Sequence, residues 1–388
     1  MEQQEQIRVL KEIMQHLDKG TNVDAGGIRR NPTWVYTSED LAQKEWQSFY
    51  REHPQLIGMS PDLPGPGSFI TCNDFGTPVL ATRDEHGRFR AFINVCRHRG
   101  VLLEGDSSGK RSKFSCPFHA WTYSNNGDLV AVPREDHFGK VDKSCHGLVP
   151  LPAVERYGFL WVHPQPDGEL DVDRLLGGLA GEFKAWNWDG LVNLGYDSYD
   201  ARLNWKLAMD TFGETYHFKV LHRNTLALDF HANVQAYDTY GRNHRMTLVR
   251  RGIDDMRDQP EETWHISQGT LPVYYLFPNV QVNAAPFGVI LVRTYPDPKD
   301  PARSISRLGF YSRPEPLETR EKQVRGILQT FADVIRDEDY AVAARSQLGA
   351  DAGNPEYVIF GRNEPALHHY HNTYREALGM EPLELLSG

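Results

Sequence analysis

The chain has 388 residues, a length that fits two domains of ordinary size, and 40% of its residues are hydrophobic, which is enough for a large buried core. Its 42 lysines and arginines are outnumbered by 52 aspartates and glutamates, so the formal net charge is −10 and there is no basic excess to bind a nucleic acid. Four cysteines in a chain of this length exclude a small disulfide-stapled scaffold and are typical of a reducing compartment.

The N-terminal sequence and the apolar runs show whether a signal peptide or a membrane-spanning helix is expected. Residues 1–20 are charged throughout and lack the apolar segment of a signal peptide. The longest apolar runs, such as 159–162 and 288–292, are far shorter than the ~20 residues that cross a bilayer. We therefore expect a soluble, cytoplasmic protein that binds neither membranes nor nucleic acids.

The N-terminal segment is predicted to be helical. Apolar residues at helical spacing between Ile7 and Leu17 indicate an amphipathic helix. An acidic stretch that begins at Ser38 is typical of the start of a second helix, which is expected to run to about Arg51. We expect the helices of segment 1–45 to pack on the second of two domains.

Residues 46–165 have the pattern of a compact antiparallel β domain. Short runs rich in β-forming residues, such as 69–71 and 79–82, alternate with turn signals at 84–87 and 125–128. The pattern predicts a domain of short strands joined by tight turns.

Residues 166–388 mix helical and strand patterns and form the second predicted domain. The expected elements are a helix near 204–220, strands around 273–294 and 305–312, and long helices over about 317–348 and 364–378.

Two Cys-His pairs lie within the β domain. Cys96 and His98 are separated by one residue, and 17 residues later Cys116 and His119 follow with two residues between them. A tetrahedral zinc site also accepts two cysteines and two histidines, but structural zinc sites commonly use Cys-Cys and His-His pairs. Here each loop supplies one thiolate and one imidazole, which fits a [2Fe-2S] cluster with cysteines on one iron and histidines on the other. We therefore predict such a cluster, which accepts electrons from a ferredoxin-type donor.

A second group of candidate ligands lies in the predicted helix near 204–220. Glu214 precedes His217 by three residues, so the two share a helical face. His217 and His222 lie about 140° apart on a regular helix, so both face one metal only where the helix ends or bulges, which we expect near 218–221. Two imidazoles and one carboxylate leave positions on an iron open for dioxygen and substrate. Taken alone, two histidines at this spacing are more often structural residues.

The two Cys-His loops resemble those of a known family. Residues 96–100 (Cys-Arg-His-Arg-Gly) and 116–121 (Cys-Pro-Phe-His-Ala-Trp) are similar to the cluster-binding loops of Rieske proteins, specifically of ring-hydroxylating oxygenase α subunits. Ala120 departs from that family, which most often has glycine there. The run Asn-Trp-Lys at 204–206, followed by Glu-x-Tyr-His-x4-His at 214–222, resembles the iron-binding segment of the same family.

The resemblance implies a mononuclear iron held by His217, His222 and a carboxylate from the late helix. The run 338–347 is similar to the family segment that donates this aspartate. Its spacing favours Asp339, with Asp337 as the alternative.

Glu214 has a separate role by resemblance. The family's acidic residue at this position lies between the cluster of one subunit and the iron of its neighbour. A carboxylate there bonds a histidine of each centre and bridges the electron-transfer path between subunits. Many ring dioxygenases have aspartate at this position, and homotrimeric members that oxidise quaternary ammonium compounds tend to have glutamate.

The substrate pocket is expected, by resemblance, to include Met209, Asp210, Phe212, Phe218 and Phe230. An amine substrate would need an aromatic cage over its cation. The candidates for such a cage are Tyr216, Tyr274, Tyr275 and Phe277.

Three histidines near the C-terminus, His368, His369 and His371, could suggest a further metal site. We expect them instead to be exposed residues of an amphipathic terminal helix.

The fold class that the resemblance implies is α+β. It consists of a Rieske-type antiparallel β domain over 46–165 and a helix-grip (START-like) catalytic domain over 166–388, with an antiparallel sheet and long helices. The implied protein is the terminal oxygenase of a multicomponent Rieske oxygenase, with a [2Fe-2S] cluster and mononuclear Fe(II), that mono- or dioxygenates a small organic, aromatic substrate. One alternative is a monooxygenase or demethylase of a quaternary ammonium or N/O-methylated compound. Another is a non-catalytic electron carrier or ligand-binding protein.

The expected partners follow from the redox chemistry. The chain has no G-x-G-x-x-G run after a strand, so electrons from NAD(P)H are expected to arrive through a separate flavin and iron-sulfur reductase, directly or by way of a ferredoxin. In the family, the two metal centres of one chain are too far apart for fast electron transfer, and a head-to-tail trimer brings those of neighbouring subunits together. The short chain favours a homotrimer without a second type of subunit.

Overall fold

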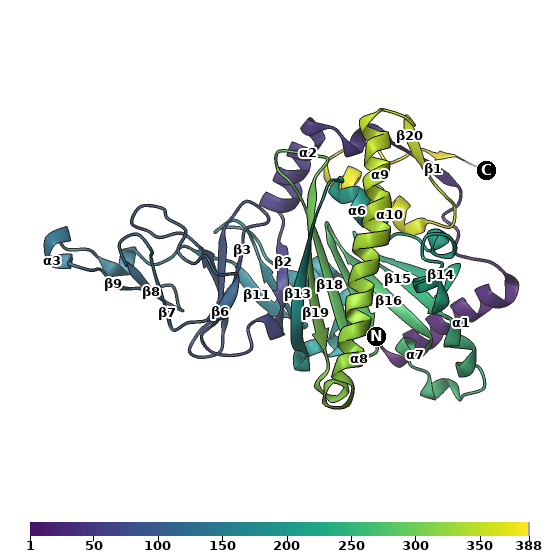
Figure 1. Ribbon diagram of the computed structural model, residues 1–388, viewed down its shortest axis with the longest axis horizontal. Coiled ribbons are helices and arrows are strands. Elements are labelled where there is room, and N and C mark those ends of the chain that lie inside the picture. Colours follow the sequence, from purple (N-terminus) through teal and green to yellow (C-terminus); the bar gives the residue numbers. More distant parts are fainter. Residues whose placement is uncertain (387–388) are drawn as a thin grey trace. The chain divides into compact units, whose positions relative to one another are not determined.

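A computed structural model describes residues 1–386, which divide into two compact units (Figure 1). The small unit comprises residues 46–175, and the large unit comprises residues 1–45 together with the chain from residue 176 onwards. The helix α4 (Val172–Leu176) lies where the chain passes from one unit to the other. Every helix within residues 1–386 is too short or too polar to span a lipid bilayer.

The small unit is built from three antiparallel sheets with strand orders β10-β5-β4-β3-β6, β11-β12-β2 and β7-β8-β9. Its strands are β2 (Gln55–Met59), β3 (Ser68–Cys72), β4 (Val79–Arg83), β5 (Phe89–Ile93), β6 (Ser108–Lys110), β7 (Lys113–Ser115), β8 (Thr122–Ser124), β9 (Leu129–Ala131), β10 (Pro150–Leu151), β11 (Ala153–Arg156) and β12 (Phe159–Val162). Its helical segments are the π-helix η2 (Trp46–Arg51), η3 (Ser60–Asp62), α3 (Glu135–Phe138) and η4 (Lys143–Cys145).

The turn between β4 and β5 explains one of the predicted hairpins. The Asp84 carboxylate accepts hydrogen bonds from the backbone N–H groups of His86 (2.9 Å) and Arg88 (2.8 Å). Gly87 has a φ of +76°, a left-handed conformation that glycine adopts without steric strain. The predicted turn at 84–87 is therefore confirmed, and it joins two strands of the largest sheet in this unit.

A seven-stranded antiparallel sheet, in the order β13-β19-β18-β17-β16-β15-β14, forms the centre of the large unit. Its strands are β13 (Val192–Ala201), β14 (Phe230–Tyr240), β15 (Asn243–Arg250), β16 (Thr270–Leu276), β17 (Val280–Ala285), β18 (Gly288–Pro296) and β19 (Ser304–Ser312). The strands expected within 273–294 and 305–312 are confirmed as parts of β16 to β19. The other three strands were not predicted, because polar residues such as those of β13 (VNLGYDSYDA) obscure the alternation of a half-buried strand.

The long helices pack on one face of this sheet (Figure 1). Val324, Leu328 and Ala332 of α8 share a buried core with Ile290 of β18 and Leu308 of β19. The helices of the unit are α1 (Gln3–Lys19), α2 (Glu39–Glu45), α5 (Leu179–Trp186), α6 (Trp205–Asp210), α7 (Ile266–Gly269), α8 (Pro314–Val334), α9 (Tyr340–Asp351) and α10 (Pro365–Ala377). The π-helix η10 (Ile335–Asp339) joins α8 to α9, so the predicted helix over 317–348 is confirmed but has a wider turn within it.

The remaining elements of the large unit are the N-terminal helix, a small sheet and several 3-10 helices. The amphipathic α1 is confirmed, and it buries Val9, Leu10 and Ile13 against β14, β15 and the segment after them. A small sheet has the order β20-β1-β21, with β1 (Ile28–Pro32), β20 (Tyr357–Phe360) and β21 (Leu385–Leu386). The 3-10 helices are η1 (Thr33–Tyr36), η5 (Trp188–Gly190), η6 (Tyr216–Lys219), η7 (Leu226–Leu228), η8 (Arg251–Met256) and η9 (Glu261–Thr263).

The register of the sheet shows which face holds the candidate site. Met246 pairs with Val273, Val273 with Asn283, and Asn283 with Ile290. Directly paired residues of antiparallel strands point to the same side of a sheet. Since Ile290 lies in the core under α8, these side chains all point towards the long helices.

Candidate metal centres

Two loops of the small unit, one after β5 and one after β7, begin with Cys96 and Cys116 and share a backbone pattern. In each loop the cysteine N–H donates to the carbonyl oxygen five residues later, which belongs to Val101 (2.8 Å) or Trp121 (2.8 Å). The N–H four residues after the cysteine donates back to the cysteine carbonyl. The loops are therefore equivalent turns, although their histidines stand at different offsets.

The residue four positions after each cysteine has a left-handed backbone. Gly100 has a φ of +72°, and Ala120, at the equivalent position, has a φ of +56°. This conformation is costly for residues with a Cβ atom, which gives a physical reason for glycine at that position in the resembling family.

The two loops place their thiols inside the unit and their imidazoles towards its surface. Cys96 and Cys116 are only 2% and 4% exposed and belong to the core of the unit. The rings of His98 and His119 lie 4.8 Å apart, and His98 is half-buried while His119 is exposed. The indole of Trp121 stacks on His98 at 4.9 Å.

These four side chains fit a [2Fe-2S] cluster. Burial raises the pKa of the Cys116 thiol, and its contact with Cys96 adds to this effect, so two neighbouring thiolates need bound cations. Burial and the neighbouring His119 lower the pKa of His98, which favours the neutral form that binds metal. Two sulfur and two nitrogen donors from two loops match the ligand set of a Rieske cluster.

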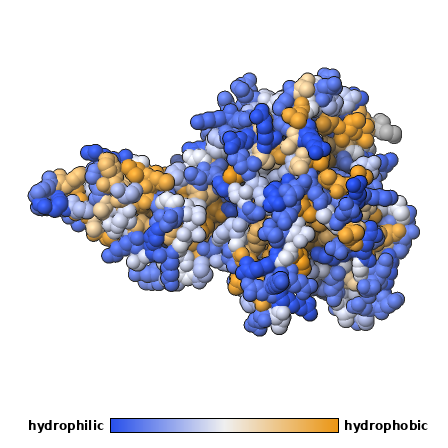
Figure 2. Space-filling model, viewed as in Figure 1, coloured by the Kyte–Doolittle hydropathy of each residue, from blue (hydrophilic) through white to orange (hydrophobic). Residues whose placement is uncertain are grey.

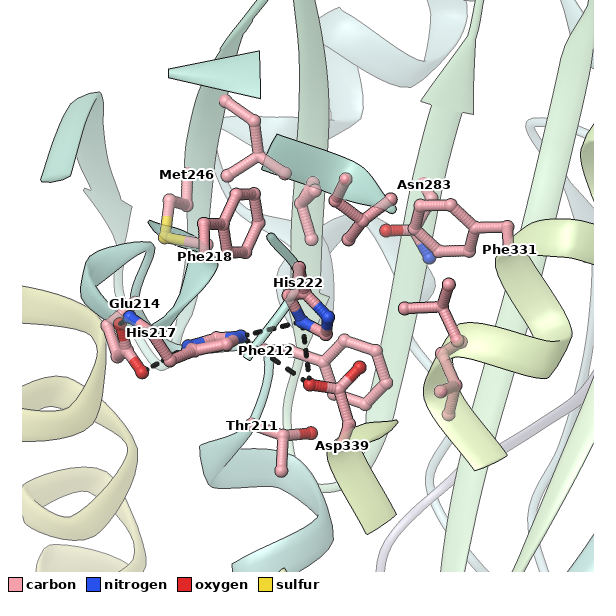
Figure 3. A pocket seen from close by; sticks show the side chains of 15 residues that line it. Thr211, Phe212, Glu214, His217, Phe218, His222, Met246, Asn283, Phe331 and Asp339 are labelled. Carbon is pink, nitrogen blue, oxygen red and sulfur yellow. Dashed lines mark hydrogen bonds and ion pairs between the residues drawn. The ribbon is translucent and has the colours of Figure 1, made fainter. Parts of the chain in front are cut away.

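The second group of candidate ligands meets inside the large unit (Figure 3). The Nε2 atoms of His217 and His222 lie 3.0 Å apart. Asp339 Oδ1 lies 3.1 Å from the Nε2 of His222 and 3.5 Å from that of His217. One ligand atom from each of the three residues lies within 4.8 Å of the others, so one ion can bind all three.

The helix predicted over 204–220 is wrong beyond Asp210. The chain leaves the helix there, and this break allows the two histidines to meet. The α-helix α6 ends at Asp210, and Glu214 lies in a loop rather than on a helical face shared with His217. The 3-10 helix η6 then ends at Lys219, before His222. The expected irregularity near 218–221 therefore belongs to a longer break, which turns both imidazoles towards one point.

Each imidazole is held by a glutamate at its other nitrogen. Glu214 bonds Nδ1 of His217 and also accepts the backbone N–H of His217 at 3.1 Å. Glu338 Oε2 lies 2.7 Å from Nδ1 of His222. A carboxylate beside Nδ1 favours the tautomer with its hydrogen there, so both Nε2 atoms present lone pairs.

Converging lone pairs are the evidence that these residues fit a metal. Two such Nε2 atoms cannot bond each other, and the buried Asp339 Oδ1 near them has no well-directed hydrogen bond. Burial lowers the pKa of His217, but Asp339 and Glu214 outweigh it and raise that pKa to about 9. Without metal the group therefore holds a proton. A divalent cation can replace that proton, and two imidazoles with one carboxylate form the ligand set of non-haem Fe(II) oxygenases.

The structure distinguishes the neighbouring acidic residues. Asp337, the alternative ligand from the sequence, is 59% exposed and pairs with Arg336 at 2.6 Å, so it does not reach the histidines. Asp339 lies among them and is buried. The π-helix η10 ends at Asp339, where it faces the histidines.

A cavity adjoins the three candidate iron ligands (Figure 3). Phe212 and Phe218 lie next to the histidines, and Asn283 and Phe331 lie on the side of the sheet and α8. The cavity is lined by Thr211, Phe212, Glu214, His217, Phe218, His222, Leu226, Met246, Leu248, Val273, Asn283, Phe331, Val334, Ile335 and Asp339.

Three of the five expected pocket residues lie elsewhere. Of the described residues, Met209, Asp210 and Phe230 are not among those that line the cavity. Met209 is fully buried in α6, and Asp210 is bonded to Tyr36 at 2.9 Å. Phe230 packs behind Phe218, with ring centroids 6.3 Å apart.

The candidates for an aromatic cage are also placed away from this cavity. Tyr216 is exposed, and Phe277 is buried beneath Arg242. Tyr274 is fully buried, with its hydroxyl 2.9 Å from Glu182, and Tyr275 donates to the carbonyl of Pro278. The cavity wall of the described chain contains none of the four.

The C-terminal histidines are not exposed, which corrects the expectation from the sequence. His368 and His371 are buried in α10, and His369 is half-buried. His371 Nε2 lies 2.9 Å from Asp210. The helix is amphipathic, but its histidines belong to the buried side, where His368 bonds the carbonyl oxygen of Gly361 and His371 bonds Asp210.

Glu338 and most residues of the cavity wall, Asn283 among them, were not singled out from the sequence. Glu338 occurs in an acidic run, which is usually a solvated face. Asn283 is a single polar residue within the apolar strands around 282–292, which were expected by resemblance to line the pocket. Glu214 beside His217 was the available signal for Glu338. Metal-binding histidines commonly have a carboxylate partner, so His222 could be expected to have one as well.

A known protein family matches each of the two units. The profile "Rieske [2Fe-2S] domain" matches residues 53–152, and the profile "Ring hydroxylating alpha subunit (catalytic domain)" matches residues 188–380. The large oxygenase component of salicylate 5-hydroxylase from Ralstonia sp. is 32% identical over 212 residues, about half of either chain (50% and 49%). The carnitine monooxygenase oxygenase subunit of Acinetobacter baumannii is 25% identical over 323 residues, which cover 82% of this chain and 84% of that protein.

A solved structure confirms the predicted fold class. The quaternary ammonium Rieske monooxygenase CntA matches with a TM-score of 0.78 at 20% identity, over 92% of this chain and 97% of the other. With profiles for both domains matched along one chain, the protein belongs to the Rieske non-haem iron oxygenases, in the family of ring-hydroxylating oxygenase α subunits.

Proposed function

We propose that the protein is the terminal oxygenase component of a Rieske oxygenase that hydroxylates a small, uncharged aromatic compound. Bound at their sites, the cluster supplies electrons and the iron activates dioxygen beside the substrate. In this proposal Cys96, His98, Cys116 and His119 hold the [2Fe-2S] cluster, and His217, His222 and Asp339 hold the iron.

The proposed substrate class is based on the apolar wall of the cavity. Apart from the metal-binding group and Glu214, its side chains are apolar except for Thr211 and Asn283. Three phenylalanines, Phe212, Phe218 and Phe331, offer ring faces and edges to a planar substrate. The amide N–H of Asn283 donates to the carbonyl of Ile290 at 3.3 Å, which holds the side chain in one orientation. In that orientation the amide can position one polar group of the substrate.

The charges around the cavity argue against a zwitterionic substrate such as carnitine. Within residues 1–386, no lysine or arginine lines the cavity, so a substrate carboxylate would lie there without a basic partner. The two acidic residues, Glu214 and Asp339, are engaged with the histidines. A buried ion without a partner is costly, which favours an uncharged substrate.

A second candidate is oxidation or demethylation of a methylated ammonium compound without a carboxylate. The same three phenylalanines support it, because aromatic ring faces attract an organic cation. Relatives also support it, since the carnitine monooxygenase subunit matches over most of its length.

An isosteric pair of probes separates the two candidates. tert-Butylbenzene and phenyltrimethylammonium have the same shape and differ only in the charge of the central atom. The iron-loaded protein, with its cluster chemically reduced, is exposed to oxygen with each probe, and hydroxylated or demethylated product is measured in a single turnover without a reductase. We expect product mainly from tert-butylbenzene. Product mainly from phenyltrimethylammonium would establish the second candidate, and product from neither would reject this substrate class.

We further infer that the protein works as a homotrimer in the cytoplasm with a separate reductase. Apolar side chains reach the surface of both units (Figure 2). Phe118 and Phe138 are exposed near the cluster loops, and Tyr216 and Val220 are exposed on either side of His217. Such exposed apolar groups beside both centres support docking of one copy's small unit on another copy's large unit. Glu214 then bridges the two centres.

Subunit complementation tests this arrangement. Cys116→Ser removes the cluster site and His222→Ala removes the iron site, so neither variant is active alone. In mixed trimers a complete electron path forms wherever an intact cluster adjoins an intact iron site of the neighbour. We expect activity from the co-expressed variants, and a mass of three times 44.3 kDa in solution. An active monomer of the unaltered protein, or no activity in mixed oligomers, would contradict the trimer.

A further inference from the structure

One carboxylate of the large unit contacts a candidate iron ligand but has no part in the function proposed so far. Glu338 Oε2 lies 2.7 Å from Nδ1 of His222 and also accepts the hydroxyl hydrogen of Thr225 at 2.9 Å. His222 is only 1% exposed, whereas Glu338 is 26% exposed. Glu338 therefore reaches from the edge of the site to a ring that water does not reach.

Glu338 and Asp339 contact opposite ends of the same imidazole. Asp339 Oδ1 lies 3.1 Å from Nε2 of His222, and Glu338 bonds its Nδ1. Both belong to the π-helix η10, whose wider turn presents consecutive side chains to one ring. His222 is thus held at both nitrogens by a single turn of the chain, while Thr225 fixes the carboxylate from the segment after His222.

The chemistry of this contact differs from that of an ordinary surface ion pair. The hydrogen on Nδ1 points to the carboxylate, so the ring keeps the tautomer in which Nε2 has the lone pair. A carboxylate in that position also makes the imidazole a stronger donor to metal. In the described chain, Glu338 forms an ion pair with His222 but with no lysine or arginine.

We propose that Glu338 is a positioning residue for the iron, acting through His222 with Thr225 as its support. The inference rests on the proposed iron site but not on the choice of substrate. Its consequence is retention of the metal: loss of the Glu338 carboxylate weakens iron binding although Glu338 is not a ligand. Asp337 provides a matched control, because it lies in the same turn but is exposed and pairs with Arg336.

The experiment measures the Fe(II) dissociation constant by anaerobic competition with a chromophoric chelator, for the complete protein without substrate. Glu338→Ala is expected to weaken iron binding about 10- to 100-fold, the usual range for the loss of such a partner. Glu338→Gln should fall between this variant and the unaltered protein, since an amide oxygen accepts the same hydrogen bond without the charge. Asp337→Ala should bind iron like the unaltered protein. The cluster absorbance gives the amount of protein with an intact small unit, and the melting midpoint by far-UV circular dichroism shows in each sample whether the large unit is folded.

A spectroscopic readout separates positioning from a general loss of structure. The nitric oxide complex of the bound Fe(II) should show a changed EPR signal in Glu338→Gln at full iron loading, and an unchanged signal in Asp337→Asn. If Glu338→Ala fails to fold, Glu338→Gln decides the matter by both measurements. Unaltered protein that binds no iron beyond the cluster would reject the proposed function. Unaltered iron affinity and EPR signal in the Glu338 variants would overturn this inference alone.

Discussion

The candidate histidine ligands of the two metal centres lie in opposite surroundings. In the small unit, His119 is exposed and His98 is half-buried against the ring of Trp121. In the large unit, His222 is buried, and the Nδ1 atoms of both His217 and His222 are bonded to glutamates. The first arrangement leaves imidazoles at a surface, where we propose that electrons pass between subunits. The second encloses them and adds negative charge, which favours retention of a divalent ion.

We expect the two centres to fail independently, since their candidate ligands lie in separate compact units. The unaltered protein is expected to contain about three irons and two acid-labile sulfides per chain. Cys116→Ser should retain about one iron and no sulfide, and His222→Ala should retain about two of each. Both variants should lose turnover completely, the largest effect expected here. Loss of the mononuclear iron from Cys116→Ser would show that the centres are not independent.

A second prediction concerns the enclosed centre alone. Asp339→Asn removes the anionic ligand and should weaken iron binding at least as much as the loss of a supporting partner, about 100-fold or more. Asp337→Asn changes an exposed residue that does not reach the histidines, so its iron affinity should equal that of the unaltered protein. Iron content after gel filtration, with the cluster absorbance as reference, compares the two. Iron loss in Asp337→Asn rather than in Asp339→Asn would exchange their roles.

The same contrast explains how much the sequence could predict. The cluster loops were recognisable because all four candidate ligands lie within 24 residues and each loop is a local turn closed by its own backbone. The iron site joins segments more than 100 residues apart, so its carboxylate could be chosen only by resemblance. The structure brings Asp339 to the histidines because the turn of η10 faces them.

Errors in the prediction occurred where tertiary packing overrides local pattern. The helix expected to extend to 220 ends at Asp210, and the loop after it packs tightly on α10. A Cβ atom added at Gly213 would lie only 2.4 Å from a methyl group of Leu367, a contact that no local pattern reveals. Met209 and Asp210 belong to the last turn of this helix, where Met209 is fully buried and Asp210 bonds Tyr36, so neither lines the cavity.

The two glutamates beside the candidate iron ligands are expected to differ in function. Glu214 is expected to bridge the centres of neighbouring subunits, whereas Glu338 supports iron retention only. With iron fully loaded, Glu214→Gln should therefore slow oxidation of the reduced cluster by oxygen about 10- to 100-fold, the range for loss of a residue that tunes a metal centre. Glu338→Gln should change that rate much less. Stopped-flow absorbance of the cluster in the presence of substrate measures both, and equal rates in the two variants would contradict the bridging role.

The smallest expected effect separates the two otherwise equivalent cluster loops. Gly100 and Ala120 occupy the same left-handed position, but only alanine has a Cβ atom to oppose it. The left-handed conformation costs an ordinary residue about 1–2 kcal/mol, and the greater freedom of glycine in the unfolded chain offsets about 0.5–1 kcal/mol of that. Ala120→Gly should thus stabilise the small unit by about 0.5–1 kcal/mol, and Gly100→Ala should destabilise it by a similar amount.

A Cβ atom at residue 100 would have no atom within 4 Å other than those of its chain neighbours. The effect of Gly100→Ala therefore depends on backbone conformation alone. Loss of cluster absorbance on heating reports the stability of the unit that holds both loops. The melting midpoint should rise in Ala120→Gly and fall in Gly100→Ala, while iron and sulfide content stay unchanged. A lower midpoint in Ala120→Gly would mean that the methyl group of Ala120 makes a stabilising contact that outweighs its backbone strain, and the two loops would then differ in packing as well as in sequence.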